Sequence, residues 1–276
     1  MIKVLVTGSN GQMGCCLSYI SDSHSSMKFH FLSQEKLDIK NYKSILSFFK
    51  ANKIDYIINC AAYTNVDKAE KESDKAKLIN VLGVKNLVKI SEVFNAKLIH
   101  ISTDYVFDGF GKNELNELDK TNPLGVYGET KLKGEKLVLN SKGQGIVIRT
   151  SWLFSPFGNN FVKTILNLSN SKQKISVIND QYGRPTYGLD LAEVIIKLIN
   201  SSKSFKNKIY HFSNEGVVTW YDFAKSIIKL SESKCELVPI KTDEYSSKAS
   251  RPKHVALSTN LIESSLKLQI PNWKDS

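Results

Sequence analysis

Residues 2–14, IKVLVTGSNGQMG, decide the fold. The run Ile2–Thr7 is apolar and β-branched, which predicts a strand buried on both faces, as in a parallel sheet. Gly8, Gly11 and Gly14 follow where this strand turns into a helix. Small residues are needed there because the chain turns sharply, its backbone approaches a pyrophosphate, and the first N–H groups of the helix face the anion. The stretch predicts a dinucleotide-binding loop, with an ordinary structural turn as the alternative.

Further strand-like runs follow along the first half of the chain. We expect them at residues 29–32, 56–60, 97–102 and 145–151, and apolar residues at helical spacing lie between 78 and 94. Strands that alternate with helices predict right-handed βαβ units. The sequence therefore predicts an α/β fold with a doubly wound parallel Rossmann sheet.

The rhythm of strands and helices changes after Trp152, where a Gly/Asn/Pro-rich stretch, SPFGNN, begins a region of shorter elements. We expect a strand at 175–178, a helix from about 189, a strand at 208–212 and a helix after Trp220. This change predicts a small interleaved C-terminal substrate lobe beside an NAD(P)-binding core. The core is expected at 1–152 plus 187–214, and the lobe at 153–186 plus 215–276.

The end of the second strand bears on the choice of cofactor. It reads Phe31-Leu32-Ser33-Gln34, with no acid at its tip. In NAD-preferring folds, an acid about twenty residues beyond the glycine loop binds the ribose 2′-hydroxyl. We therefore expect both NADPH and NADH to be accepted. Asp38 is a candidate for hydrogen-bonding the adenine amine, and a helix N-cap is the alternative.

Tyr127 and Lys131 lie four residues apart in VYGETKLKGE, so a helix there places both on one face. A phenol with a pKa of about 10 exchanges protons poorly at neutral pH unless an ammonium stabilises its phenolate. Such a pair also occurs by chance on solvated helices. The fourth strand, however, ends in Ser102-Thr103-Asp104-Tyr105, which places hydroxyls at the carboxyl edge of the sheet, where ligands bind. A hydroxyl there can bond a substrate carbonyl and stabilise the alkoxide that forms.

The overall composition excludes several classes of protein. Hydrophobic residues make up 41% of the chain and the mean hydropathy is −0.23, so a folded domain is expected. We find neither an apolar run long enough for a membrane span nor a signal peptide, and so expect a cytoplasmic protein without membrane partners. The four cysteines form neither a disulfide framework nor a C-x-x-C pair, and no metal site is expected.

The net charge of +11 suggests a polyanionic partner at first sight. However, 35 of the 38 basic residues are lysines scattered along the chain, and no nucleic-acid-binding motif accompanies them. Nucleic acid is therefore not an expected partner. The three arginines are Arg149, Arg184 and Arg251.

A set of motifs runs in order along nearly the whole chain. They are TGSNGQMG (7–14), NCAAYT (59–64), VDKAE (66–70), HISTDYVFDG (100–109), the Tyr127/Lys131 pair, RTSW (149–152), GNNFVKT (158–164), SVINDQYGRPT (176–186), WYDFA (220–224) and SRP (250–252). Together they resemble the extended short-chain dehydrogenase/reductases and, more narrowly, the dTDP-4-dehydrorhamnose reductase family.

This resemblance implies a reaction and a catalytic set. NADPH or NADH would reduce the C4 ketone of dTDP-6-deoxy-L-lyxo-4-hexulose to give dTDP-L-rhamnose for cell-surface polysaccharide synthesis. Thr103 would bond the carbonyl and Tyr127 would protonate the C4 oxyanion. Lys131 would tune Tyr127 and hold the nicotinamide ribose.

The resemblance also implies binding residues. The cofactor would contact Gly8, Gly11, Gln12, Met13, Gly14, Asp38, Ile39, Ala61, Ala62 and Tyr63, besides Tyr127 and Lys131. Thr103, Asp104, Tyr105, Trp152 and Asn160 would lie near the sugar, with a core position as the alternative for the two aromatic residues. Arginine suits bidentate phosphate contact, so Arg184 and Arg251 are candidates for the dTDP diphosphate, whereas Arg149 is expected in a structural ion pair.

The sequence departs from the family at two places. Some members join two subunits through a magnesium ion held by a glutamate after the glycine loop, where this chain has Cys15-Cys16-Leu17. A thiol is a poor magnesium ligand, so we expect no such bridge, and a homodimer through another surface stays open. Relatives typically continue into a terminal helix beyond the position of Ser276, and three outcomes stay open: exposed apolar surface, a covering partner, or a dispensable helix.

Other functions remain alternatives. A related reductase would act on a different nucleotide-linked 4-ketohexose. A non-catalytic NAD(P)-binding regulatory subunit would have lost part of the catalytic set, which Thr103, Tyr127 and Lys131 argue against.

Overall fold

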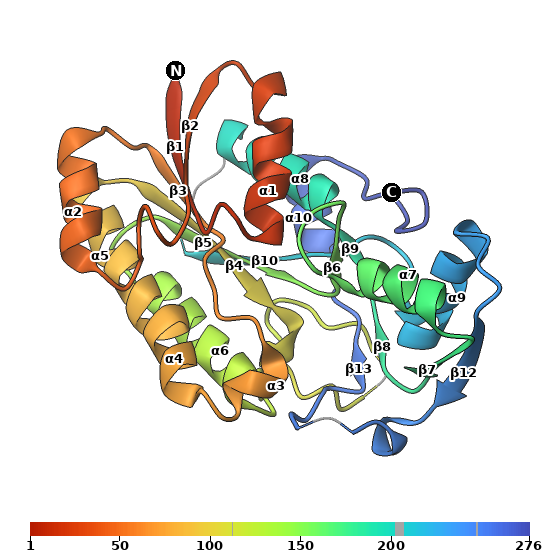
Figure 1. Cartoon of the computed structure of the whole chain (residues 1–276). Coiled ribbons are helices and arrows are strands. Elements are labelled where there is room, and N and C mark those ends of the chain that lie inside the picture. The colour runs from red at the N-terminus through yellow and green to blue at the C-terminus, as the bar shows by residue number, and fades with distance from the viewer. Residues whose placement is uncertain (112, 202–206, 247) are drawn as a thin grey trace.

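A parallel sheet of six strands forms the centre of the molecule (Figure 1). The structure is a computed structural model that describes residues 1–111, 113–201, 207–246 and 248–276. The strands lie in the order β2–β1–β3–β4–β5–β10, which is that of a doubly wound sheet and confirms the predicted fold class. Their bounds are β1 Ile2–Thr7, β2 Met27–Leu32, β3 Tyr56–Asn59, β4 Lys97–Thr103, β5 Gly145–Thr150 and β10 Lys208–Phe212.

Helices cover both faces of this sheet (Figure 1). Val4 and Val6 of β1 pack against α1 and α8 on one face, whereas Leu5 packs with α2 and α5 on the other. Successive side chains of a strand point to opposite faces, so a strand covered on both sides is apolar throughout. The helices are α1 Gln12–Ile20, α2 Tyr42–Ala51, α3 Val66–Ala69, α4 Ser73–Lys77, α5 Val84–Phe94, α6 Val126–Leu139 and α8 Gly188–Asn200, with a π-helix, Leu78–Gly83, between α4 and α5.

A second group of elements has its own hydrophobic core, which includes Ile165, Ile175 and Phe223. In Figure 1 these elements lie together on one side of the large sheet. They are α7 Phe161–Ser171 and α9 Trp220–Leu230, the pair β7 Lys174–Ile178 and β12 Glu236–Ile240, the sheet of β8 Tyr182–Gly183, β11 Val218–Thr219 and β13 His254–Val255, and the pair β6 Leu153–Phe154 and β9 Thr186–Tyr187.

The last helix, α10 (Asn260–Leu266), belongs by its contacts to the large sheet. It contacts β10, and its Ile262 packs in the core of that sheet, together with Ile270. The expected lobe 215–276 includes this helix, although the helix packs in the core of the large sheet. The division stays a prediction.

The expected elements lie within about two residues of the observed ones where a comparison is possible. The strand 208–212 has the expected bounds, β2 begins two residues before its expected start, and β3 ends at Asn59. In the part of the chain that the structure describes, no helix is both long and apolar enough to cross a membrane.

A buried ion pair ties α6 to the sheet. Arg149 of β5 donates from Nη2 to Oε2 of Glu135 over 2.8 Å, and its Nε also donates to this carboxylate. Ser102 of β4 donates to Oε1 of Glu135 over 2.5 Å. The carboxylate is fully buried, so its bonds replace those that water would make. The expected structural ion pair of Arg149 is confirmed.

We predict that Arg149→Met lowers the free energy of unfolding by about 3–5 kcal/mol, because it leaves the Glu135 carboxylate buried without its counter-ion. Lys174→Met is the matched control, since it breaks the exposed pair with Glu236 and should cost less than about 1 kcal/mol. Urea unfolding followed by circular dichroism measures both. Equal losses in the two variants would contradict the assigned role of burial.

Candidate active site

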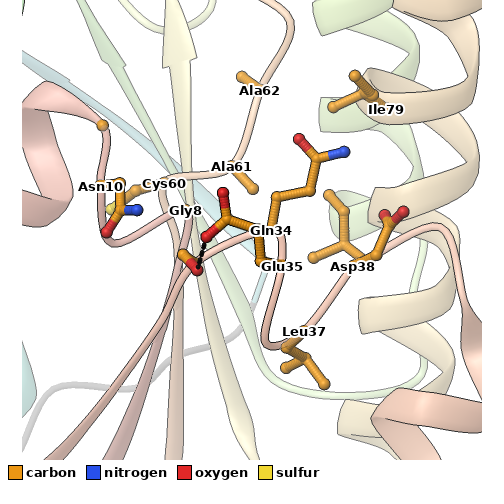
Figure 2. A pocket seen from close by; sticks show the side chains of 13 residues that line it. Gly8, Asn10, Gln34, Glu35, Leu37, Asp38, Cys60, Ala61, Ala62 and Ile79 are labelled. Carbon is orange, nitrogen blue, oxygen red and sulfur yellow. Dashed lines mark hydrogen bonds between the residues drawn. The ribbon is translucent and has the colours of Figure 1, made fainter.

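The strand order of the large sheet reverses between β1 and β3, and the loops that follow these strands border a pocket of about 350 Å³ (Figure 2). Ligands of open α/β sheets bind at such a reversal. Of the residues expected to contact the nucleotide, those that line this pocket are Gly8, Gly11, Asp38, Ile39, Ala61 and Ala62.

The glycine loop leaves space for a ligand at the start of α1. Gly8 has a φ of +64°, and a Cβ there would lie 2.7 Å from the backbone of Ala61, so a side chain is excluded. Gly11 is the N-cap of α1, and no side chain caps this helix. The first N–H groups of a helix lack intrahelical partners and attract anions. The loop therefore fits a pyrophosphate.

Gln12, at the first position of α1, also has a side chain that fits a ligand. Its Oε1 is buried and has no hydrogen-bond partner within the described residues. Gln12 and Met13 line a second pocket, which shares Gly11, Cys60 and Ala62 with the first. Because a buried acceptor without a donor is costly, this oxygen suits a ligand that brings an N–H or O–H group.

Asp38 lies in the first pocket and does not cap a helix. Asn41 caps α2 instead, and its side chain accepts from the N–H of Ser44. The Asp38 carboxylate accepts from the backbone N–H of Lys40 and faces its ammonium at 3.3 Å. The structure thus removes the N-cap alternative and leaves Asp38 beside the pocket.

Glu35 is a pocket residue that sequence reasoning missed. It lies beyond Ser33 and Gln34 at the end of β2, and its carboxylate accepts from the Ser33 hydroxyl over 3.2 Å (Figure 2). The expectation that no acid stands at this edge is therefore corrected. The signal was present, since the glutamate follows the glycine loop by about twenty residues.

The second pocket, of about 460 Å³, gathers the expected catalytic residues. Thr103 and Asp104 come from the carboxyl end of β4, and Tyr127 and Lys131 come from one face of α6. Thr103 Oγ1 donates to Asp104 Oδ1 over 3.0 Å. The ring of Tyr105 meets that of Tyr127 edge-on, with 5.5 Å between centroids. The pocket therefore contains a hydroxyl, a phenol and an ammonium around one space.

Burial shifts the protonation of these groups. It raises the pKa of Tyr127 to about 12, although a hydrogen bond with Thr103 acts in the opposite direction. It lowers the pKa of Lys131 to about 8 against the attraction of Glu135, and raises the pKa of Asp104 to about 7. At pH 7, Tyr127 is a neutral phenol and Lys131 is mostly charged. The pair can deliver a proton and stabilise the phenolate left behind.

Two indole rings form a wall of the same pocket. Trp152 stacks on Trp220 with 3.6 Å between ring centroids and 12° between planes. Trp152 has a φ of +46°, which is rare for a bulky residue. Trp220 was not among the expected site residues, although the motif WYDFA contains it. The stacked pair presents flat apolar surface to a ligand.

Comparisons with known proteins agree with this geometry. A family profile described as the RmlD substrate binding domain matches residues 2–276. A dTDP-4-dehydrorhamnose reductase from Aggregatibacter actinomycetemcomitans is 38% identical, over 99% of this chain and 96% of that protein. The spore coat polysaccharide biosynthesis protein SpsK of Bacillus subtilis is 39% identical, over 95% and 91%.

The crystal structure of a dTDP-4-dehydrorhamnose reductase from Bacillus anthracis in complex with NADP is 37% identical, with a TM-score of 0.95, and the match covers 100% of this chain and 97% of that one. The chain belongs to the dTDP-4-dehydrorhamnose reductase family. The resemblance inferred from its motifs is confirmed.

Not every residue that the family resemblance pointed to borders the two pockets. Asn160 is the N-cap of α7 and donates to the carbonyl of Ser155, while its neighbour Asn159 lines the pocket. Tyr63 and Gly14 are both buried, and neither residue lines either pocket. Their expected contact with the cofactor stays a prediction.

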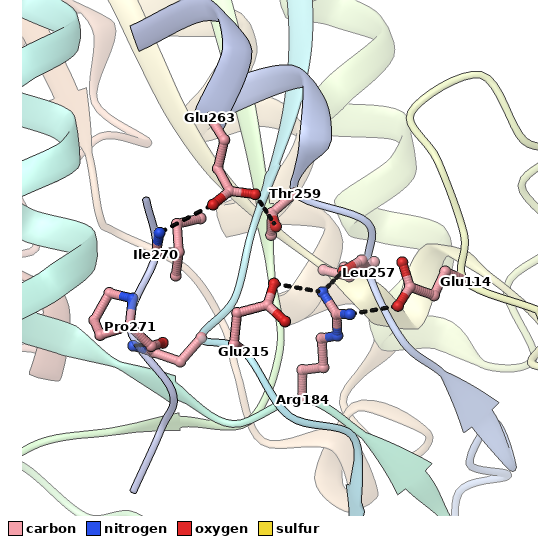
Figure 3. Close-up of polar contacts among 9 residues, drawn as sticks. Glu114, Arg184, Glu215, Leu257, Thr259, Glu263, Ile270 and Pro271 are labelled. Atoms are coloured by element: carbon pink, nitrogen blue, oxygen red, sulfur yellow. Dashed lines mark hydrogen bonds and ion pairs between the residues drawn. The ribbon is translucent and has the colours of Figure 1, made fainter. Parts of the chain in front are cut away.

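Arg184 lies away from the pockets, where it joins three segments of chain (Figure 3). Its guanidinium donates to Glu114, faces Glu215 at 3.5 Å and donates to the carbonyl of Leu257 over 3.1 Å. These partners bond its two terminal nitrogens, whereas its buried Nε has no hydrogen-bond partner among the described residues. The side chain is 7% exposed and lines neither pocket, so the structure does not bring Arg184 to the pocket of the catalytic residues.

Arg251 lies behind the second pocket. It donates to Asp67 over 2.7 Å and hydrogen-bonds Tyr105, which lines that pocket. Asp67 also accepts from the backbone N–H groups of Lys248 and Ala249. Arg251 therefore connects the 248–251 segment to a pocket residue and is itself 18% exposed in its side chain.

We predict that Asp104→Asn stabilises the protein more at pH 8 than at pH 5. Burial raises the pKa of Asp104 from 3.8 to about 7, so the folded state loses stability as the pH rises across this interval, and the loss persists above it. An asparagine at this position carries no ionisable proton, so the variant does not lose this stability as the pH rises. Thermal unfolding should show a gain in Tm at least about 2 °C larger at pH 8.

Asp67→Asn is the control for this test. A hydrogen bond from Arg251 lowers the pKa of Asp67, so its ionised form stabilises the fold, and the variant should be less stable at both pH values. If Asp104→Asn changed Tm equally at pH 5 and pH 8, the inferred titration of Asp104 would be wrong.

Proposed function

We propose that this protein reduces the C4 ketone of dTDP-6-deoxy-L-lyxo-4-hexulose to dTDP-L-rhamnose, with NADPH or NADH as reductant. The observation that carries the proposal is that Thr103, Tyr127 and Lys131 line one pocket, which continues into the pocket of the glycine loop. The names of the relatives support the substrate, and the NADP bound to the Bacillus anthracis enzyme supports the cofactor.

The residues present fit a dinucleotide. Gly8, Gly11 and the start of α1 would hold its pyrophosphate, with Asp38, Ile39, Ala61 and Ala62 along the adenosine half. Gln12, Met13 and Lys131 line the second pocket. Gln12 and Met13 would meet the nicotinamide half, and Lys131 would hold its ribose. When bound, the reduced cofactor supplies the hydride that the ketone carbon accepts.

The side chains of this chain supply the proton. Tyr127, protonated at neutral pH, gives its proton to the C4 oxygen as negative charge develops there. Thr103 would orient the carbonyl by turning its hydroxyl proton from Asp104 to the same oxygen. The charge of Lys131 stabilises the phenolate that Tyr127 becomes. Each of these interactions strengthens as charge develops, so each favours the transition state over the ketone.

The substrate has a separate set of contacts. Asp104 and Tyr105 would lie beside the hexulose. The stacked Trp152 and Trp220 would form an apolar wall against which the hexulose or the thymine base of the substrate packs. Arg251 is the remaining arginine candidate for the diphosphate, through a movement that releases it from Asp67. Arg184 and Asn160 act indirectly, by shaping the segments around the pocket.

The broader assignments follow the same proposal. Residues 153–186 with 215–276 act as the substrate lobe, and 1–152 with 187–214 as the NAD(P)-binding core. The enzyme works in the cytoplasm, where its nucleotide-linked substrate and cofactor are found, and a homodimer through a surface other than the Cys15–Leu17 region is compatible with it. A different nucleotide-linked 4-ketohexose is the alternative substrate, and a regulatory subunit without activity is the alternative class.

We predict that the protein, given dTDP-6-deoxy-L-lyxo-4-hexulose and NADPH, oxidises the cofactor and forms dTDP-L-rhamnose, identified by NMR of the product. L-talose stereochemistry would redirect the assignment to another reductase. No turnover with this and related 4-ketohexoses, together with retained cofactor binding, would favour the regulatory subunit.

We predict that Tyr127→Phe lowers kcat by at least about 100-fold and leaves the Kd for NADPH nearly unchanged, because only the proton donor is removed. Tyr182→Phe is the control. It removes the hydroxyl of an exposed tyrosine in β8 and should keep wild-type turnover. Steady-state kinetics and cofactor fluorescence measure the two quantities. Unchanged turnover in Tyr127→Phe would remove Tyr127 as the acid.

We predict that Glu35→Gln raises the ratio of kcat/KM for NADPH over NADH by about tenfold, or about 1.4 kcal/mol. The reason is that the Glu35 carboxylate stands at the β2 edge, where the ribose 2′-phosphate of NADPH would meet it. Glu236→Gln, in the distant strand β12, should leave the ratio unchanged. An unaltered ratio in Glu35→Gln would show that its carboxylate does not face the phosphate.

The wild-type protein should still use both cofactors, as the sequence predicts. A preference for NADH above roughly a hundredfold, about 2.7 kcal/mol, would contradict this expectation.

A further inference from the structure

A buried line of polar side chains runs beneath the catalytic pocket and ends at Lys131. Thr7 Oγ1 donates to Asn59 Oδ1 over 2.7 Å, Asn59 Nδ2 lies 3.0 Å from His100 Nδ1, and His100 Nε2 lies 3.5 Å from Lys131 Nζ. The four residues come from β1, β3, β4 and α6, and none is more than 2% exposed. Nothing in the proposed reaction uses Asn59 or His100.

The orientation of the Asn59 amide is fixed by the backbone. The N–H of Ala61 donates to Asn59 Oδ1 over 3.2 Å. A backbone N–H can only donate, so the amide oxygen must face it, and turning the amide would place two donors together. The Asn59 NH₂ group therefore faces the ring of His100.

This orientation fixes the tautomer of His100. Because Nδ1 accepts from Asn59, it carries no proton, and the ring proton lies on Nε2. Burial holds the pKa of His100 well below its usual value, and the charge of Lys131 acts in the same direction. The ring is therefore neutral, and its N–H is directed at the Lys131 nitrogen.

An N–H donor facing Lys131 distinguishes the two protonation states of the lysine. Lys131 Nζ already donates to the carbonyl of Ile101 over 2.6 Å. If Nζ is an ammonium, the ring N–H and the ammonium are two donors facing each other. If Nζ is an amine, its lone pair accepts from the ring. The contact therefore favours the amine.

The other charged or titratable groups around Lys131 do not supply this preference. Glu135, on the same helix, favours the ammonium, but the Arg149 guanidinium of β5 is paired with it. Cys60, after β3, is a neutral thiol because burial raises its pKa. Asp104 and Tyr127 line the same pocket, and an ionised Asp104 would favour the ammonium too.

We propose that His100, oriented by Asn59, is a positioning residue that favours the uncharged form of Lys131 and so sets the pH above which the reductase loses activity. This inference rests on the proposed function for its kinetic consequence. The tautomer of His100 and the titration of Lys131 do not depend on it, so the two can fail separately.

Nitrogen NMR of the ¹⁵N-histidine-labelled protein tests the tautomer directly. His100, assigned from the signals lost in His100→Gln, should be neutral with its proton on Nε2 from pH 6 to pH 9. Asn59→Asp replaces the NH₂ donor by an acceptor and should move the proton to Nδ1. A wild-type ring protonated on Nδ1, or on both nitrogens, would overturn the proposal.

Kinetics and lysine NMR test the consequence. In the wild type, kcat/KM should fall as the pH rises through about 8, where Lys131 loses its proton. His100→Asn removes the facing N–H, and His100→Gln can present a carbonyl to the ammonium. Both variants should shift the alkaline fall of kcat/KM to a pH higher by about half a unit or more. The titration of Lys131 in ¹³C-lysine spectra should shift upward by the same amount.

Thr7→Val is the matched control. It removes a hydrogen bond to the same Asn59 oxygen but leaves the Ala61 N–H, which is sufficient to orient the amide. The His100 proton should therefore stay on Nε2, and the pH at which kcat/KM falls should not change. If folded His100 variants kept the wild-type titration of Lys131, the proposal would be overturned. If neither variant folds, the wild-type and Asn59→Asp spectra decide.

Discussion

The buried carboxylate of Glu135 is the constraint on which the catalytic geometry depends. It accepts from Ser102 of β4 and from Arg149 of β5, so it fixes α6 to two adjacent strands. Tyr127 and Lys131 lie eight and four residues before it on the same helix face. A shift of α6 along the sheet that displaced the phenol and the ammonium would also break these bonds. The ion pair therefore contributes orientation, where a hydrophobic replacement would contribute only burial.

The same arrangement separates the groups that must be rigid from those that must meet a ligand. Glu135, Arg149 and His100 are buried under the carboxyl edge of the sheet, whereas Thr103, Tyr127 and Lys131 line the space above it. Side chains in the lower layer bond to one another and to neighbouring strands. Those in the upper layer keep capacity for a substrate oxygen or a ribose. A preorganised site of this kind needs little rearrangement when charge develops.

The sequence predicted the strands, the glycine loop and the catalytic set because each has a local pattern. Glu135 also fits a local pattern, since Tyr127, Lys131 and Glu135 are spaced four residues apart. A glutamate on a helix is usually solvated, however, and its burial becomes visible only when β4 and β5 are placed against α6. Glu35 was missed because the search for an acid stopped at Gln34, whereas Glu35 lies three residues beyond the end of β2. Arg184 and Asn160 were assigned to ligands from their motifs. No local sequence pattern shows that Arg184 pairs with Glu114 and Glu215, or that Asn160 is the N-cap of α7.

Burial acts on Tyr127 and Lys131 in opposite directions, and the two shifts cannot be tuned separately because one pocket holds both groups. Excluding water from this pocket makes the phenol harder to ionise and the lysine easier to neutralise. A bound ligand that excludes more water would therefore weaken the acid unless it also brings polar groups to the ammonium. The hydroxyls of a nicotinamide ribose held by Lys131, as proposed, would supply such groups. In the proposed reaction, the bound cofactor would then do more than supply a hydride, since it would preserve the Lys131 charge on which the proton transfer depends.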